Sequence, residues 1–213
     1  MKLSFKINRV VRNFILSDML LFSGWGLITP IFSVFVLEKV VGATLVVIGT
    51  STAIYWLTRS IIQLPLAGFL DRTDGEKDDF YTLVVGLLLI SSSAFAFTIV
   101  HNVKELFLVQ GLYAVGFALY TPAWSAIFSR HMDKNRIALS WSLNSTSLGI
   151  SAGIAGFLSG IIAEQFGFKT IFIIAGLFSL LAALIIFIVP DIVIPRMTRK
   201  RPVREDHTPL TIT

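Results

Sequence analysis

The sequence predicts an all-α polytopic membrane protein with six transmembrane helices. Three observations predict this class: 54% hydrophobic against 15% charged residues, a mean hydropathy of +0.78, and six long apolar stretches separated by short charged loops. A soluble domain of this composition could not cover its surface with polar groups, so lipid is the expected solvent. None of the stretches alternates apolar and polar residues as a transmembrane barrel strand does, which leaves helices as the prediction.

Six segments are long enough to cross a hydrocarbon core of about 30 Å, which needs roughly 20 apolar residues per helix. The predicted spans are 14–37, 45–70, 81–100, 106–128, 139–163 and 170–189. They define a basic N-terminal segment at 1–13, a transmembrane bundle at 14–190 and a basic tail at 191–213, which we expect to be disordered. The first span is too long and too polar at Asp18 for a cleaved signal peptide, so we expect it to remain.

Lysine and arginine residues fall on alternate loops. Of the 18, fourteen lie in the N-terminal segment, the second and fourth loops and the tail, three lie in the other loops, and Arg59 lies within a span. This asymmetry predicts that both termini are cytoplasmic. The net charge of +5 therefore indicates topology and attraction to the lipid bilayer, and no nucleic-acid partner is expected.

The six spans differ in how many polar residues they contain. Spans 81–100 and 170–189 are almost wholly apolar, which predicts a position at the periphery of the bundle. The other four contain the polar and amphipathic side chains and are expected to line a cavity or an interface. Their main residues are Asp18, Trp25, Thr29, Trp56, Thr58, Arg59, Gln63, Gln110, Tyr113, Tyr120, Thr121 and Asn144.

Arg59 is the most costly residue to insert, because a charged side chain at the bilayer centre costs about 2.5 to 3.5 kcal/mol on insertion scales. It is predicted to lie roughly 16 Å from the cytoplasmic end of its span, too deep to reach the headgroups by snorkelling. We favour a substrate or coupling site in a water-filled cavity. The alternative is a structural arginine, held by an ion pair or by carbonyl groups, that fixes this span to a neighbour.

Asp18 is the only acidic residue within a span, about one turn from the predicted cytoplasmic end. It is a candidate for proton coupling, although it is also placed to cap or complement a helix N-terminus. A direct bond to Arg59 is not expected, since their predicted depths differ by roughly 10 Å. In span 139–163, residues Gly149, Gly153, Gly156 and Gly160 form a small-residue stripe that predicts close helix packing and would also suit a sliding contact.

No catalytic, metal or cofactor site is expected. The chain has no Cys, and His101, His131 and His207 fall in loops or the tail without metal-ligand spacing. Intramembrane enzyme chemistry would need a His, a carboxylate pair or a metal cluster within the spans. The acidic run from Asp74 to Asp79 lacks calcium-loop spacing and is interpreted as a solvated turn.

Residues 64–77, which end the second span, resemble the loop signature of the major facilitator superfamily. The matching positions are Gly68, Asp71, Arg72, Gly75 and Lys77, although two glycine spacings differ by one residue and Glu76 stands where a basic residue is usual. The run from Gly24 to Pro30 and the pair Gln110–Gly111 are similar to further elements of that family. The resemblance extends over all six spans.

The resemblance implies two inverted three-helix repeats, with helices one and four on a cavity, two and five at a seam, and three and six outermost. It also implies a secondary active transporter, ion- or proton-coupled, that moves a small-molecule solute by alternating access in a bacterial cytoplasmic membrane. The candidate substrate or coupling residues are Arg59, Gln63, Trp56, Asp18, Gln110, Tyr113 and Asn144.

This family normally has twelve helices in two bundles, so the cavity would face lipid unless a second bundle covers it. The second bundle is expected to be another copy of the chain, in a homodimer, or a separate six-helix half; a truncated reading frame is a further alternative. In a homodimer, Asp71 would lie at the N-terminus of the other copy's fifth helix, near Ile137, and act as a gate. A non-transporting membrane scaffold or partner-binding subunit is the alternative function.

Overall fold

A computed structural model describes residues 8–72 and 76–188. Within these residues the chain forms seven helices: α1 Arg9–Ile28, α2 Phe32–Lys39, α3 Leu45–Leu70, α4 Lys77–Phe97, α5 Val103–His131, α6 Ile137–Phe166 and α7 Phe168–Phe187. Helices α3 to α7 are each long and apolar enough to cross a membrane, and α1 and α2, counted together as one bent span, make a sixth. The all-helical transmembrane prediction is confirmed, whereas the predicted tail, most of the N-terminal segment and Gly75 lie outside the described residues.

The first span differs most from its prediction as a single helix over 14–37. Helix α1 begins at Arg9, where the Asn8 side chain accepts a hydrogen bond from the Val10 amide, so the predicted start is five residues late. The chain then breaks before α2, and the two helices differ in direction by 46°. Pro30 explains the break, because proline lacks an N–H and its ring clashes with the preceding helical turn.

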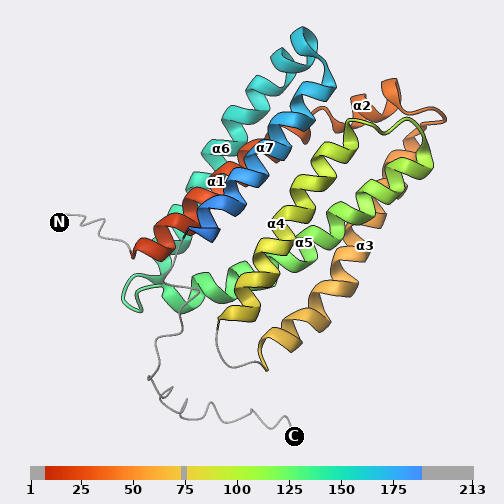
Figure 1. Cartoon of the computed structure of the whole chain (residues 1–213). Coiled ribbons are helices and arrows are strands. Elements are labelled where there is room, and N and C mark those ends of the chain that lie inside the picture. Colours follow the sequence, from red (N-terminus) through yellow and green to blue (C-terminus); the bar gives the residue numbers. More distant parts are fainter. Residues whose placement is uncertain (1–7, 73–75, 189–213) are drawn as a thin grey trace, which may run out of the picture.

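The six spans pack as two groups of helices that run side by side (Figure 1). Helices α1, α6 and α7 form one group, and α3, α4 and α5 form the other. Helix α4 packs against α5 and α7, α7 also packs against α1, and α3 and α6 lie against α5 and α1 respectively. The start of α1, the ends of α3, α5 and α7, and the starts of α4 and α6 meet at one end of the bundle. The loops predicted to be cytoplasmic therefore gather at one end.

Glycine residues allow the central helices to approach closely. A Cβ atom at Gly86 of α4 would lie 2.7 Å from the backbone nitrogen of Tyr120 on α5, and one at Gly24 of α1 would lie 2.9 Å from the Ala175 Cα on α7. These contacts leave no room for a side chain. The α4–α5 and α1–α7 pairs are thus fixed at short range, which sets the positions of the cavity-lining helices.

Helices α3 and α6 are the most exposed of the five unbroken spans. In the most apolar stretch of 18 residues, 11% of α3 and 17% of α6 is buried, against 44% to 50% for α4, α5 and α7. Helices α4 and α7 pack against each other and against α5 and α1, and each also has an exposed face, with Leu88 on α4 and Leu177 on α7. The placement of spans 81–100 and 170–189 at the periphery stays a prediction. Apolar composition does not distinguish a helix surrounded by lipid from one surrounded by apolar helices.

The glycine stripe of α6 contacts no other helix among the described residues. A Cβ atom at Gly149, Gly153, Gly156 or Gly160 would meet nothing within 4 Å outside its own helix. Packing within the chain does not explain this stripe. Its use as a contact surface for a second bundle stays a prediction.

A charged cluster joins α4 to α5 at the end of the bundle where the lysine- and arginine-rich loops gather, which we call the basic end. Asp79, with a side chain only 2% exposed, pairs with Arg130, and His131 Nδ1 lies 3.6 Å from a Glu76 carboxylate oxygen. Burial raises the pKa of Glu76, while His131 and Arg130 act to lower it. The prediction of a solvated acidic turn is wrong for Asp79, because the last turn of α5 carries cations that pair with the first turn of α4.

Candidate functional site

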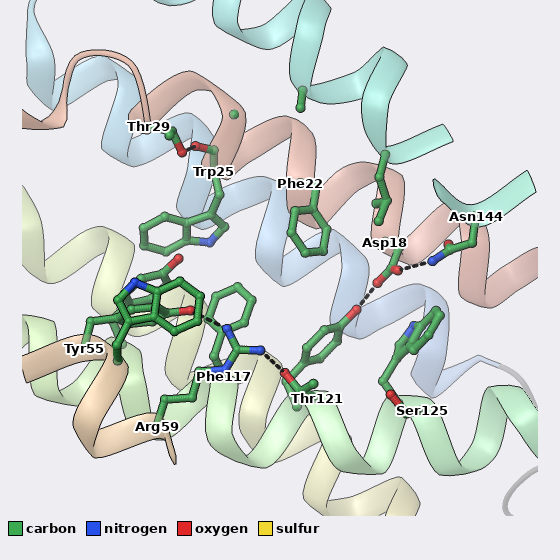
Figure 2. Close-up of a pocket in the computed structure, with 17 residues that line it drawn as sticks. Asp18, Phe22, Trp25, Thr29, Tyr55, Arg59, Phe117, Thr121, Ser125 and Asn144 are labelled. Carbon is green, nitrogen blue, oxygen red and sulfur yellow. Dashed lines mark hydrogen bonds between the residues drawn. The ribbon is translucent and has the colours of Figure 1, made fainter. Parts of the chain in front are cut away.

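A cavity of about 420 Å³ lies between α1, α3, α5 and α6, close to the size range of small-ligand sites (Figure 2). These are the four spans whose polar residues predicted a shared cavity, so that prediction is confirmed. The lining residues are Asp18, Phe22, Trp25, Gly26, Thr29, Tyr55, Trp56, Arg59, Tyr113, Phe117, Tyr120, Thr121, Trp124, Ser125, Asn144, Leu148 and Ala152.

Arg59 enters the cavity from α3 and donates hydrogen bonds to three neutral side chains. Its Nε bonds to Gln63 Oε1 at 3.3 Å, and its two terminal nitrogens bond to the Tyr55 hydroxyl at 2.8 Å and the Thr121 hydroxyl at 3.0 Å. Tyr55 and Gln63 lie one turn to either side of Arg59 on α3, whereas Thr121 lies on α5. The guanidinium is therefore held in a fixed orientation by its own helix and by one bond across the cavity.

Aromatic rings surround this guanidinium. Its Cζ atom lies 5.8, 5.4 and 5.5 Å from the ring centroids of Tyr55, Trp56 and Phe117. Cation–π contacts at such distances stabilise a cation without neutralising it. No acidic side chain in the described part of the chain forms an ion pair with Arg59. The predicted alternative of a structural ion pair is thus not what the described residues provide, although the Thr121 bond does connect α3 to α5.

Asp18 lies inside the bundle. It follows the first residue of α1 by nine positions, or about 14 Å of helix, so its predicted alternative as a helix cap is wrong. The carboxyl group is 3% exposed, accepts a hydrogen bond from the Tyr120 hydroxyl on α5, and accepts another from Asn144 Nδ2 on α6 at 3.2 Å. Figure 2 shows Asp18 and Arg59 in separate hydrogen-bonded groups. A buried carboxyl group that meets only neutral donors is suited to proton exchange.

A stack of three aromatic rings forms one wall of the cavity. Tyr113 lies between Trp25 and Tyr55, with ring centroids 3.9 and 4.7 Å apart and interplanar angles of 22° and 20°. Phe117 packs edge-on against all three. This arrangement joins α1, α3 and α5 by ring contacts of the kind that stabilise aromatic clusters.

Three buried polar atoms of the lining have no hydrogen-bond partner among the described residues. They are the indole nitrogens of Trp25 and Trp124 and the Oδ1 atom of Asn144. Buried polar groups are normally paired, so each of these is a candidate contact for a molecule in the cavity.

The structure brings five of the seven predicted substrate or coupling residues to the cavity lining: Asp18, Trp56, Arg59, Tyr113 and Asn144. Gln63 contacts the site through Arg59. Gln110 is buried outside the lining, with an unpaired Oε1 atom. The described residues of the loop signature, Gly68, Asp71, Arg72 and Lys77, lie in the last turn of α3, just after it and at the start of α4, and none of them lines the cavity.

Sequence reasoning missed half of the aromatic lining, namely Phe22, Tyr55, Phe117 and Trp124. A signal was present, because Tyr55 lies one helical turn before Arg59, and Phe117 lies midway between Tyr113 and Thr121 at the same spacing. Side chains four residues apart share a helix face.

Comparison with known proteins identifies relatives over nearly the whole chain. A family model described as the Major Facilitator Superfamily matches residues 14–212. An uncharacterized MFS-type transporter of Methanocaldococcus jannaschii is 26% identical over 186 residues, which cover 87% of this chain and 47% of that protein. The crystal structure of the POT family transporter PepTSo superposes with a TM-score of 0.70 and 16% identity, over 92% of this chain and 40% of that one. The chain thus spans less than half the length of these two proteins.

Proposed function

The chain belongs to the Major Facilitator Superfamily, and from that premise we propose that it is one half of a secondary active transporter that moves a small solute by alternating access. The observation that carries this proposal is the cavity itself. A guanidinium, that of Arg59, and a buried carboxyl group, that of Asp18, both line it, and its walls come from four helices that could move relative to one another.

Charged residues within membrane spans are rare and usually mark substrate or ion pathways. In this cavity Arg59 is the proposed substrate-binding residue and Asp18 the proposed coupling residue. Tyr120 and Asn144, which hold Asp18, come from α5 and α6. A change in the packing of these helices on α1 would alter how Asp18 is bonded, so transport and proton exchange would be coupled.

We propose that a second six-helix bundle covers α3 and α6. Their exposed apolar faces and the open glycine stripe support this, as does the length of the relatives. The second bundle is another copy of this chain or a different chain. The proposed inverted repeat is supported by the packing, because α3 lies on α5 as α6 lies on α1, and α4 lies on α5 as α7 lies on α1. Both termini are proposed to be cytoplasmic.

The test is solute uptake by membrane vesicles, using a panel of labelled organic anions, cations and neutral solutes. Vesicles that contain this chain should accumulate at least one class, and Arg59→Ala should abolish that uptake at equal membrane expression. Lys39→Ala is the control: it also removes one positive charge, but from an exposed lysine outside the cavity, and it should keep uptake. Uptake that is equal in Arg59→Ala and wild type would contradict the proposal.

A membrane scaffold is the second candidate function. The Arg59–Thr121 bond supports it, because a bond between α3 and α5 would also stabilise a static bundle. If the protein is a scaffold, Arg59→Ala should lower its thermal stability, and neither form should take up any solute class.

A further inference from the structure

We infer that the cavity binds small monoanionic solutes with a flat aromatic body. This inference rests on the proposed function, since it names the class of solute that such a transporter would carry. The charge, the hydrogen-bond donors and the rings of the lining each point to this class.

The charge that a solute would meet is positive. Arg59 has five N–H donors, and three of them bond to neutral oxygens of Tyr55, Gln63 and Thr121, which leaves two without a partner among the described residues. A guanidinium in a medium of low dielectric is stabilised most by an anion that accepts two of its hydrogen bonds. A carboxylate is such an anion, and the described residues do not supply one to Arg59.

Asp18 does not make the site suited to a zwitterion. It is 3% exposed, and each of its oxygens already accepts one hydrogen bond, from Tyr120 or from Asn144. A solute ammonium group would therefore meet a carboxyl group that is almost closed to it. Arg59 is partly exposed, so it is the charge that a solute can reach.

The unpaired atoms of the lining are mainly donors. The indole N–H groups of Trp25 and Trp124 have no acceptor within the described chain. An indole nitrogen can only donate. Among the described residues, the one buried acceptor of the lining without a partner, Asn144 Oδ1, belongs to the side chain that already bonds Asp18. A solute rich in acceptor oxygens therefore fits the unpaired groups better than one rich in donors.

The body of the solute would lie among rings. Eight of the seventeen lining residues are aromatic. Trp56 is 56% exposed and lies 5.4 Å from the Arg59 Cζ atom, so it offers a ring next to the guanidinium. Aromatic rings prefer offset-stacked or edge-on contacts with other rings, which a flat solute makes more fully than a puckered one.

The test measures binding and does not require transport. The chain is purified together with any partner that co-purifies, placed in lipid nanodiscs and studied by isothermal titration calorimetry. The probes share one skeleton: phenylpropanoate is the anion, phenylpropanamide the neutral form, phenylethylamine the cation and phenylalanine the zwitterion. Cyclohexylpropanoate keeps the charge and removes the flat ring. The wild-type protein should bind phenylpropanoate at least about tenfold more tightly than the amide and the amine, as expected for a hydrogen bond to a charged group. It should also bind phenylpropanoate more tightly than phenylalanine, and more tightly than the cyclohexyl acid, which lacks the ring contacts.

Arg59→Met should remove the preference for anion over amide, whereas Lys39→Met should keep it. Equal binding of phenylpropanoate and phenylpropanamide by the wild-type protein would overturn the inference that the solute is an anion. Tighter binding of phenylalanine would overturn it in favour of a zwitterion site, and equal binding of the cyclohexyl acid would overturn the inferred flat body. These comparisons within the wild-type protein stand even if Arg59→Met fails to fold.

Binding and transport can fail separately. Selective binding of phenylpropanoate without uptake of any solute class would support the inferred ligand and contradict the proposed function. Uptake of cations or neutral solutes, with no binding of phenylpropanoate, would support the proposed function and overturn the inferred ligand.

Discussion

Asn144 on α6 donates a hydrogen bond to Asp18 on α1, with 3.2 Å between Nδ2 and Oδ2 and 126 residues between them in sequence. The Tyr120 hydroxyl on α5 donates to the other carboxylate oxygen. One carboxyl group thus joins three of the four cavity helices. This relationship places the proposed coupling residue where a shift of α6 relative to α1 would change its bonding.

Asp18→Asn should uncouple transport and leave the fold intact. The substitution keeps the side-chain shape, and Asn144 can turn its amide so that the unpaired Oδ1 accepts from the new amide group. Gradient-driven accumulation of solute should fall to passive equilibration, while exchange of labelled for unlabelled solute continues. Ser17→Ala, which removes a buried hydroxyl that bonds the Ala182 carbonyl, is the control and should keep accumulation. Full accumulation by Asp18→Asn would show that this carboxyl group does not couple transport.

Gly153→Leu and Gly86→Leu should have different effects. A Cβ atom at Gly86 would lie 2.7 Å from backbone of α5, so a larger side chain should destabilise the bundle by about 1–3 kcal/mol or more. Gly153 faces open space within the chain. Gly153→Leu should keep the thermal unfolding temperature in detergent and reduce cross-linking to a second bundle in membranes. A Gly153→Leu protein that cross-links as the wild type does would remove the glycine stripe from the interface.

Asp79 and Arg130 should be energetically coupled. Removing Arg130 leaves the Asp79 carboxylate buried without its cation, which costs about 3–5 kcal/mol in buried pairs, whereas Arg130 is 28% exposed and its loss of Asp79 should cost less. Asp79→Asn and Arg130→Met should each lower the unfolding temperature, and the double variant should be less destabilised than the sum of the two. The exposed pair Glu38–Lys39 is the control, with an expected coupling of about 0–1 kcal/mol. Additive effects at Asp79 and Arg130 would mean that the pair contributes little.

In the proposed assembly, the Asp71 carboxylate lies at the N-terminus of α6 in another bundle, where the helix dipole favours an anion. Asp71→Asn should therefore destabilise the conformation in which the cavity is closed at the basic end. The readout is the rate at which a hydrophilic thiol reagent labels Asn144→Cys, which should rise. The chain contains no native cysteine, so labelling is specific. Asp133→Asn, at another exposed acid of the same end, is the control. Unchanged labelling and unchanged association would exclude the gate.

Much of the fold was predictable because lipid restricts what can cross it. Span 45–70 coincides with α3, and four others have the right centres, since long apolar runs leave only helices. The break between α1 and α2 was not predicted, because the apolar run continues through Pro30 and suggests one uninterrupted helix. The helices against which α4 and α7 pack were not predicted, because helix partners and lipid select the same apolar side chains.

The main polar residues of the candidate site could be predicted from the sequence, whereas their hydrogen-bond partners could not. Arg59 and Asp18 stood out because charge is rare within spans, and their lack of a direct bond was expected from depth. Their actual partners, Thr121 for Arg59 and Tyr120 for Asp18, depend on how α5 is rotated against α3 and α1. That rotation depends on packing between helices distant in sequence, including the close approach of Gly86 on α4 to Tyr120 on α5, which no local pattern encodes.

The proposed transporter depends above all on a second bundle that covers α3 and α6, and cysteine cross-linking in native membranes can detect it. Leu57 and Ile154 are exposed on the two helices, each twelve residues from the end of its helix opposite the basic end. Leu57→Cys co-expressed with Ile154→Cys should yield a covalent dimer or an adduct with another chain. Leu88→Cys and Leu177→Cys, on the exposed faces of α4 and α7, should yield neither. A second bundle would be ruled out if all four positions remained uncross-linked and reacted equally with a lipid-soluble thiol reagent.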